Sequence, residues 1–439
     1  MISPPESSTK SPGHQPAFVR RLPFLAAIVI FIVGALIRLL ADFAYKNNGY
    51  DEAVYRDYLL MVDKVGVAEY PNICELYLIK QRNPGTQATL PPTRFLYIFC
   101  GWMVKQVAFG DAPPADLKQP DAAYRDPAFI SMRQVSLVFA IVTVGLCGLA
   151  AWRMMGPGVG LGTMALVASS PLGIYMGKHA FVDGFFGFWA TLCLWLLWEN
   201  LQRPGRRWWI VSFAISLALM VMAKENALFV YIALAGLVAI NPWMKFGTVT
   251  RPLLAAGVIG PSLGVCVLLV LTGGVGPFIE IFKLFITKAN TLDFVISYGD
   301  GPWYRYLLEL IIMEPLVAVL ALTALFTLPR KSPVFAYLLI FVLVSYVIMC
   351  NLRYGMNVRF TTIWALPLAA FAAAQVISLT ANWGRYATPA AILFLALMAA
   401  SNWQQYQVYF VKNAIYEPLP PDTLKAIKIL KPAPSSAGP

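Results

Sequence analysis

Two adjacent acids stand directly after the first long apolar run of the chain. Asp51 and Glu52 lie in the stretch "NNGYDEAVYRDYLL", residues 47–60. Such a pair is typical of a helix start, with Asp51 as N-cap of a surface helix at about 52–66 and Glu52 favoured by the helix dipole. A carboxylate fixed in this way is also suited to deprotonate a hydroxyl or an amine. The two interpretations are compatible, and we predict that Asp51 does both.

A further carboxylate, Asp183, follows "SSPLGIYMGKHAF" at the expected start of an apolar helix. A carboxylate at that depth is costly unless it is paired or faces a cavity. Asp183 could neutralise Lys178, cap its own helix or take part in chemistry. His179 lies four residues earlier, hence on the same face of one helix. The two side chains could touch a metal ion, but hydrogen bonding to each other or to neighbours is the simpler interpretation.

Cations stand at the ends of apolar runs, in positions where the chain is expected to leave the outer side of a membrane: Lys178, Lys224, Arg353 and Arg359. Long cationic side chains at such positions commonly extend to lipid headgroups. They are also what the phosphate of an anionic lipid needs. Lys224 and its neighbour Glu225 are most simply interpreted as an ion pair at the water interface.

The tract "ISYGDGPWYRYL", residues 296–307, combines glycines with aromatic side chains. Glycines give the backbone freedom, and aromatic side chains favour the membrane interface. Tyr298, Trp303 and Tyr304 would then form an aromatic belt beside a turn, or they would cradle a lipid-linked ligand.

The composition requires a membrane to position these residues. Of 439 residues, 59% are apolar and 13% are charged, whereas soluble domains are about half apolar and about a quarter charged. The class is therefore a polytopic membrane protein. The net charge of +12 comes without a dense basic tract, so nucleic-acid binding is not indicated. Only two histidines are present, which excludes a histidine-rich metal site.

Apolar runs predict about eleven spans, given that a helix needs roughly 20 apolar residues to cross a bilayer. They lie at about 24–45, 130–152, 157–174, 181–200, 207–223, 225–241, 252–272, 304–328, 333–350, 359–380 and 386–402.

A further run at 91–109 is ambiguous because it contains two cations. If it does not cross, the basic turns that contain Arg203, Lys245 and Arg330 all fall on one face, as the positive-inside rule requires. We therefore expect this run to form an amphipathic helix in the outer interface.

This topology divides the chain into a disordered cytoplasmic tail at 1–22, a transmembrane catalytic unit at 23–402 and a short outer tail at 403–439. Two long outer loops lie at 46–129 and 273–303. The inner loops are short and merely basic, so we expect chemistry on the outer side alone.

Six short motifs, in this order, resemble the GT-C glycosyltransferases that use polyprenyl-phosphate sugars. That group includes protein O-mannosyltransferases and the aminoarabinose transferases of lipid A. The motifs are "DEAVY", "LPPTRFLY", "SSPLGIYMGKHAFVDG", "AKENALF", "GPWYRYL" and "RFTTIWALPLA". None is specific alone, but their order on the predicted outer face favours this superfamily.

The resemblance implies an all-α, GT-C-like bundle with interface helices in the first outer loop, and an inverting transfer from a lipid-phosphate sugar. Asp51 would be the catalytic base, supported by Glu52 and Asp183. The expected donor-phosphate contacts are Arg359, Arg353, Lys178, Lys224 and Arg94, and the expected substrate contacts are Tyr55, His179, Tyr298, Trp303 and Tyr304. Leu90 stands where the family often has His or Lys, so a divalent metal is not favoured and no cofactor is expected to be required.

Two other functions remain open at this point. A lipid or solute transporter or flippase would use the same charges as a pathway, although it would spread them through the depth of the bilayer. A non-catalytic scaffold would bind a partner through the loop at 46–129. The expected partners are the polyprenyl-phosphate sugar, a glycan, lipid or protein acceptor, and membrane lipids, with no nucleic acid. Short loops favour a multi-pass protein of the bacterial inner membrane whose active site faces the periplasm.

Overall fold

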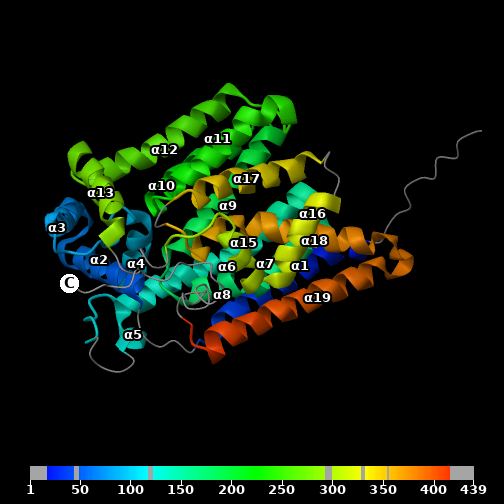
Figure 1. The fold of residues 1–439 in the computed structure, drawn as a ribbon, viewed down its shortest axis with the longest axis horizontal. Helices are drawn as coiled ribbons and strands as arrows, with labels where there is room; N and C mark the ends of the chain where they lie inside the picture. Colours follow the sequence, from blue (N-terminus) through cyan, green and yellow to red (C-terminus); the bar gives the residue numbers. More distant parts are fainter. Residues whose placement is uncertain are drawn as a thin grey trace, which may run out of the picture.

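The computed structural model describes residues 17–43, 49–116, 122–291, 299–327, 332–352 and 355–415, and within these ranges the chain is helical without strands. The long helices run roughly along the longest axis of the molecule, and α2, α3 and α4 gather at one end (Figure 1). The expected all-α architecture is confirmed.

The helices before the centre of the chain are α1 (Ala17–Leu40), α2 (Tyr50–Val65), α3 (Tyr70–Arg82), α4 (Phe95–Phe109), α5 (Ala122–Arg125), α6 (Pro127–Met155), α7 (Pro157–Ser169), α8 (Pro171–Lys178) and α9 (Val182–Gln202). The later helices are α10 (Arg207–Ala223), α11 (Ala227–Met244), α12 (Arg251–Leu271), α13 (Val275–Lys288), α15 (Arg305–Met313), α16 (Pro315–Thr327), α17 (Pro333–Cys350), α18 (Ala365–Thr380) and α19 (Ala387–Tyr406). A 3-10 helix, η3 (Val358–Trp364), precedes α18.

Six helical stretches in the described ranges are long and apolar enough to cross a membrane, or seven if the bent pair α7–α8 is one span. Three shorter apolar helices are α4, α10 and α16. The protein is thus a multi-pass membrane protein, while the count of eleven spans and the interfacial position of the run at 91–109 stay predictions. The expected surface helix at 52–66 is confirmed as α2.

Two expected spans are broken next to a proline. The run at 157–174 consists of α7 and α8, which are bent by 53° at Ser170. Pro171 opens α8, and the hydroxyl of Ser170 accepts a hydrogen bond from the Gly173 N–H at 3.1 Å. Likewise Pro315 follows a break at Glu314 in the run at 304–328. Proline has no N–H to continue the backbone hydrogen bonds of a helix. A hydropathy pattern treats proline as one more residue of an apolar run, so it predicts a continuous span.

Small residues let the helices approach closely. Gly260 and Gly264 on α12 face α10, and a Cβ at either position would lie 2.6 Å from a backbone oxygen of α10. This four-residue spacing of small residues is the usual device for close packing of helices in membranes. The close packing holds α10 against α12, and Lys224 follows directly at the C-terminal end of α10.

Candidate active site

The first turn of α2 contains both acids of the opening pair, with different roles. The N-cap of α2 is Gly49, whose N–H donates to Oε2 of Glu52 at 3.2 Å. The predicted N-cap role of Asp51 is therefore wrong, because the capping carboxylate is that of Glu52. Asp51 instead points to another helix, and its side chain is 22% exposed.

Glu52 is fully buried and connects three segments. Oε1 accepts from the Ala180 N–H at 2.7 Å and from Nε of Arg133 on α6 at 3.0 Å, and Oε2 lies 3.4 Å from Nδ1 of His179. Burial alone would raise the pKa of Glu52, but His179 and Arg133 bring this pKa below its usual range. Glu52 thus holds α2 against α6 and the turn between α8 and α9.

The shared helical face expected of His179 and Asp183 is not found, whereas hydrogen bonding of His179 to a neighbour, one of the expected alternatives, is found. α8 ends at Lys178 and α9 begins at Val182, so the two residues do not share one helix. His179 faces Glu52, whereas Asp183 accepts a hydrogen bond from Nζ of Lys224. The suggested neutralisation of Asp183 by Lys178 is also wrong.

Arg359, on η3, connects the two acids expected at the site. Its Nη1 donates to Oδ2 of Asp51 at 2.9 Å, and its Nε lies 4.0 Å from Oδ2 of Asp183. The guanidinium lies over the ring of Phe181 at 4.6 Å, and Oδ1 of Asn357 accepts from its backbone N–H at 2.9 Å. Asp51, Arg359, Asp183 and Lys224 therefore form one chain of alternating charge.

A second buried pair flanks this chain. Arg94 donates from Nε to Oε2 of Glu225 at 3.0 Å and from Nη1 to the hydroxyl of Tyr55. Thr93 donates to Oε1 of the same carboxylate at 3.1 Å. The expected ion pair between Lys224 and Glu225 is therefore wrong. Lys224 binds Asp183, and Glu225 binds Arg94.

The irregular segment 88–92 presents Arg94 to the site. Pro91 and Pro92 carry no N–H, so this segment cannot join a helix. Its carbonyl oxygens accept hydrogen bonds from phenol groups of α2 and α3. The pairs are Tyr50 to Ala88 at 3.0 Å, Tyr58 to Leu90 at 2.7 Å and Tyr70 to Pro92 at 2.7 Å.

Other predicted residues lie away from this cluster. Nζ of Lys178 donates to the Leu39 carbonyl at 3.0 Å. Trp303 and Tyr304 stand at the start of α15 with 65% and 39% of their surface exposed, and the Trp303 carbonyl accepts from the Tyr346 hydroxyl at 2.6 Å. Arg353 and Tyr298 lie outside the described residues.

Sequence reasoning missed Arg133, Glu225 and Asn357 as members of the site. Arg133 carried a usable signal, since a lone cation at the start of an apolar helix needs a partner. Among the described residues, no group of three or more His, Cys, Asp or Glu side chains could hold a metal ion.

An apolar cavity of about 80 Å³ adjoins the charged chain. Gly184 lines it next to Asp183, and Thr361 and Thr362 line it from η3, close to Arg359. The Thr362 hydroxyl donates to the Asp183 carbonyl at 3.1 Å, which joins the two segments. The rest of the wall is formed mainly by apolar side chains of α7, α8, α16 and α18, among them Leu166, Leu172, Met176, Val317 and Leu368.

Comparison with solved structures decides the fold. The oligosaccharyltransferase of Archaeoglobus fulgidus in its apo form aligns with a TM-score of 0.58 at 11% identity, covering 90% of this chain and 56% of that chain. This chain has the GT-C fold. The fold that the resemblance implied is thereby confirmed.

Two further solved structures align with the chain. AglB from Archaeoglobus fulgidus, in complex with an inhibitory peptide and a dolichol-phosphate, gives the same identity, coverage and TM-score as the apo form. ArnT from Cupriavidus metallidurans in the apo state is 15% identical, with 88% of this chain and 63% of that chain covered and a TM-score of 0.48. The chain thus spans less than two thirds of these structures.

A family model described as dolichyl-phosphate-mannose-protein mannosyltransferase matches residues 109–280. The match includes Asp183, Lys224 and Glu225 but neither Asp51 nor Arg359. None of the curated proteins matches the chain.

Proposed function

We propose that this chain is an integral-membrane glycosyltransferase that moves a sugar from a polyprenyl-phosphate donor to an acceptor. The observation that carries the proposal is the contact between Asp51 and Arg359 beside an apolar cavity. Such a transfer needs a base at the acceptor, a cation at the departing phosphate and an apolar space for the lipid. The similarly folded AglB, solved with a dolichol-phosphate, supports this donor class.

Asp51 is the best candidate for the base. Glu52 is fully buried and accepts several hydrogen bonds, and Asp183 is held between Lys224 and Arg359. Asp51 is more exposed than either, and no group in the described ranges donates to its Oδ1. That oxygen is available to an acceptor hydroxyl or amine.

The proposed step is a single displacement at the anomeric carbon. The acceptor loses its proton to Asp51 as its oxygen or nitrogen bonds to that carbon, and the bond from the carbon to the phosphate oxygen breaks. The electron pair of that bond leaves with the lipid phosphate, which Arg359 and Lys224 stabilise. One attack inverts the anomeric centre.

Binding of the donor would also prepare the base. In the structure Arg359 is bound to Asp51. A lipid phosphate near Arg359 would compete with Asp51 for the guanidinium, because phosphate and carboxylate suit the same fork of N–H donors. The carboxylate would then turn to the acceptor.

We propose that the reaction takes place on the outer face, in the periplasm of a bacterial inner membrane. This is supported by α9, which has Asp183 in its first turn and ends at the basic turn of Arg203, a turn that the positive-inside rule assigns to the cytoplasm. The acceptor would be a glycan, a lipid or a protein. The cations of the site can supply the positive charge, so the proposal requires no divalent metal.

The test compares Asp51→Asn with Asp57→Asn, which changes an exposed acid of the same helix. Purified proteins in nanodiscs receive a panel of polyprenyl-phosphate sugars, and released polyprenyl phosphate is measured by mass spectrometry. We expect Asp51→Asn to abolish release but to keep undecaprenyl phosphate bound, and Asp57→Asn to behave as wild type. Full activity of Asp51→Asn would refute Asp51 as the base. Lipid flux across liposomes without sugar transfer would instead identify a flippase.

A further inference from the structure

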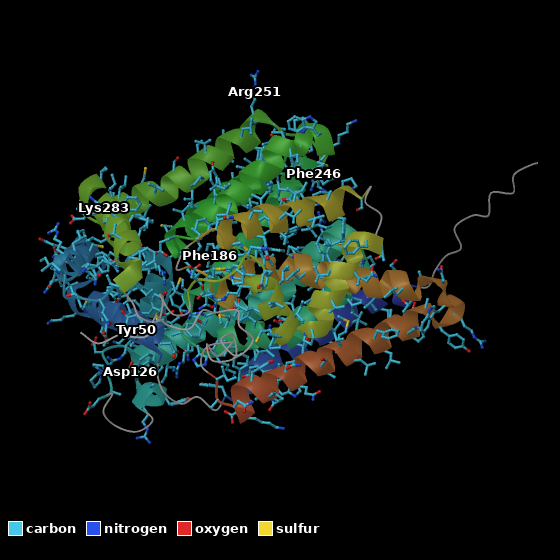
Figure 2. All side chains as sticks on the ribbon, in the orientation of Figure 1. Tyr50, Asp126, Phe186, Phe246, Arg251 and Lys283 are labelled. Atoms are coloured by element: carbon cyan, nitrogen blue, oxygen red, sulfur yellow. The ribbon has the colours of Figure 1, made fainter. Side chains whose placement is uncertain are left out.

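A polar hollow lies at the end of α9 that is remote from the active site. Asp183 stands in the first turn of α9 and Glu199 in its last turn. Sixteen residues of helix separate them by about 24 Å, since a helix rises about 1.5 Å per residue. Figure 2 shows Tyr50, the neighbour of Asp51, well apart from Phe246, which lines the hollow. A bilayer core is about 30 Å thick, so the hollow belongs to the opposite membrane face.

The hollow has a volume of about 580 Å³ and an excess of positive charge. Its charged lining consists of Arg153, Arg203, Lys245 and Glu199. Arg153 binds Glu199 through two hydrogen bonds of 2.8 Å, and among the described residues Glu199 is the one carboxylate in the lining. Nε of Arg203 lies 3.8 Å from the same carboxylate, and its side chain is 44% exposed.

Lys245 is held at the rim in a left-handed backbone conformation, with φ at 55°. This conformation ends α11, because Lys245 is the C-cap of that helix and its N–H donates to the Asn241 carbonyl at 2.8 Å. No partner for its ammonium group is found in the described ranges, and the residue is exposed. The side chain is therefore available to a ligand.

The backbone around Lys245 is fixed against α9. Gln202 donates to the Phe246 carbonyl at 2.5 Å, and the Thr248 N–H donates to the Leu201 carbonyl at 2.9 Å. Gly247 has φ at 157°, and a Cβ there would lie 2.3 Å from the Leu201 oxygen. The loop at 245–248 is therefore held in place by hydrogen bonds to α9.

We propose that this hollow binds the phosphate of an anionic phospholipid in the leaflet opposite the active site. The three cations Arg153, Arg203 and Lys245 outnumber the single carboxylate of Glu199, and cations near a membrane surface attract acidic headgroups. Trp198 and Val334 give the hollow an apolar wall for the start of the acyl chains. Trp243, 76% exposed and two residues before Lys245, is suited to the adjoining interface. Free phosphate shares this chemistry, so the test must separate the two sources.

The experiment uses the full chain purified into detergent, with native mass spectrometry and thermal unfolding as readouts. Phosphatidylglycerol, phosphatidylcholine and inorganic phosphate are added separately. The variant Arg203→Gln/Lys245→Gln is compared with Arg206→Gln/Arg207→Gln, which removes two exposed cations that do not line the hollow.

We expect wild type and the Arg206/Arg207 variant to retain phosphatidylglycerol at least tenfold better than phosphatidylcholine. The Arg203/Lys245 variant should lose that preference while it unfolds at an unchanged temperature in the absence of lipid. Equal losses in both variants would show diffuse surface attraction and overturn the proposal. Stabilisation by inorganic phosphate, with displacement of bound lipid, would overturn the lipid as occupant. A lack of preference in wild type would overturn the site altogether.

Discussion

Arg359 on η3 donates a hydrogen bond to Asp51 on α2 at 2.9 Å, although 308 positions of sequence separate the two residues. The same guanidinium approaches Asp183. One cation thus holds the most exposed acid of the site close to a buried one. The proposed transfer requires both partners of this contact, Asp51 as the base and Arg359 at the departing phosphate.

Replacement of Arg359 by Gln should lower kcat by about 100- to 1,000-fold, the usual cost of removing one group that stabilises developing negative charge. Arg359→Lys should recover only part of this loss, because an ammonium group cannot donate to two acceptors in the planar fork of arginine. The measurement is turnover with saturating donor. Arg82→Gln, in an exposed ion pair with Glu280, serves as control. Wild-type turnover in Arg359→Gln would exclude a role at the phosphate.

Glu52 should act on stability more than on the chemical step. Its carboxylate is fully buried and paired, and its removal leaves the guanidinium of Arg133 without a carboxylate partner. Loss of one partner in such a group costs about 3–5 kcal/mol. We expect Glu52→Gln to lower the unfolding temperature in detergent strongly, while Glu75→Gln, on the exposed face of α3, leaves it unchanged.

The pH dependence of this contribution has a defined sign. The pKa of Glu52 is lower in the folded protein than its ordinary value. Its contribution to stability is therefore complete above the ordinary carboxyl pKa and is lost only as the pH falls towards the lowered folded value. The difference in unfolding temperature between wild type and Glu52→Gln should stay constant from pH 8 to about pH 5 and shrink in stronger acid. A difference that shrinks between pH 8 and 6 would contradict this.

The buried pair of Lys224 and Asp183 should show strong coupling. Either single change, Lys224→Met or Asp183→Asn, removes one partner of the buried ion pair, whereas the double change removes both. We expect the double variant to be more stable than the sum of the single effects by about 1–3 kcal/mol. Thermal unfolding of the four proteins measures this. Additive effects would mean that the pair does not form.

Sequence alone identified the class of protein and four residues that the structure brings together. Composition required a membrane bundle, and acids beside misplaced cations singled out Asp51, Asp183, Lys224 and Arg359. The partners of these residues were not predictable, because pairing depends on where helices end. Lys224 and Glu225 are neighbours, yet the chain turns between α10 and α11 and sends their side chains to different partners. Hydropathy also hid the break before Val182, which placed His179 on the wrong helix face.

The tyrosines around the segment 88–92 yield the last prediction. Tyr70 is fully buried and donates to the Pro92 carbonyl, two residues before Arg94. Tyr70→Phe keeps the packing but leaves that carbonyl without its donor, at a cost of about 1–3 kcal/mol. Because the hydroxyl touches no reacting group, we expect KM for the donor to rise through a displaced Arg94 while kcat changes little. Tyr386→Phe, exposed and on the remote turn before α19, is the control. A fall in kcat with unchanged KM in Tyr70→Phe would show that this segment serves the chemical step instead of the donor.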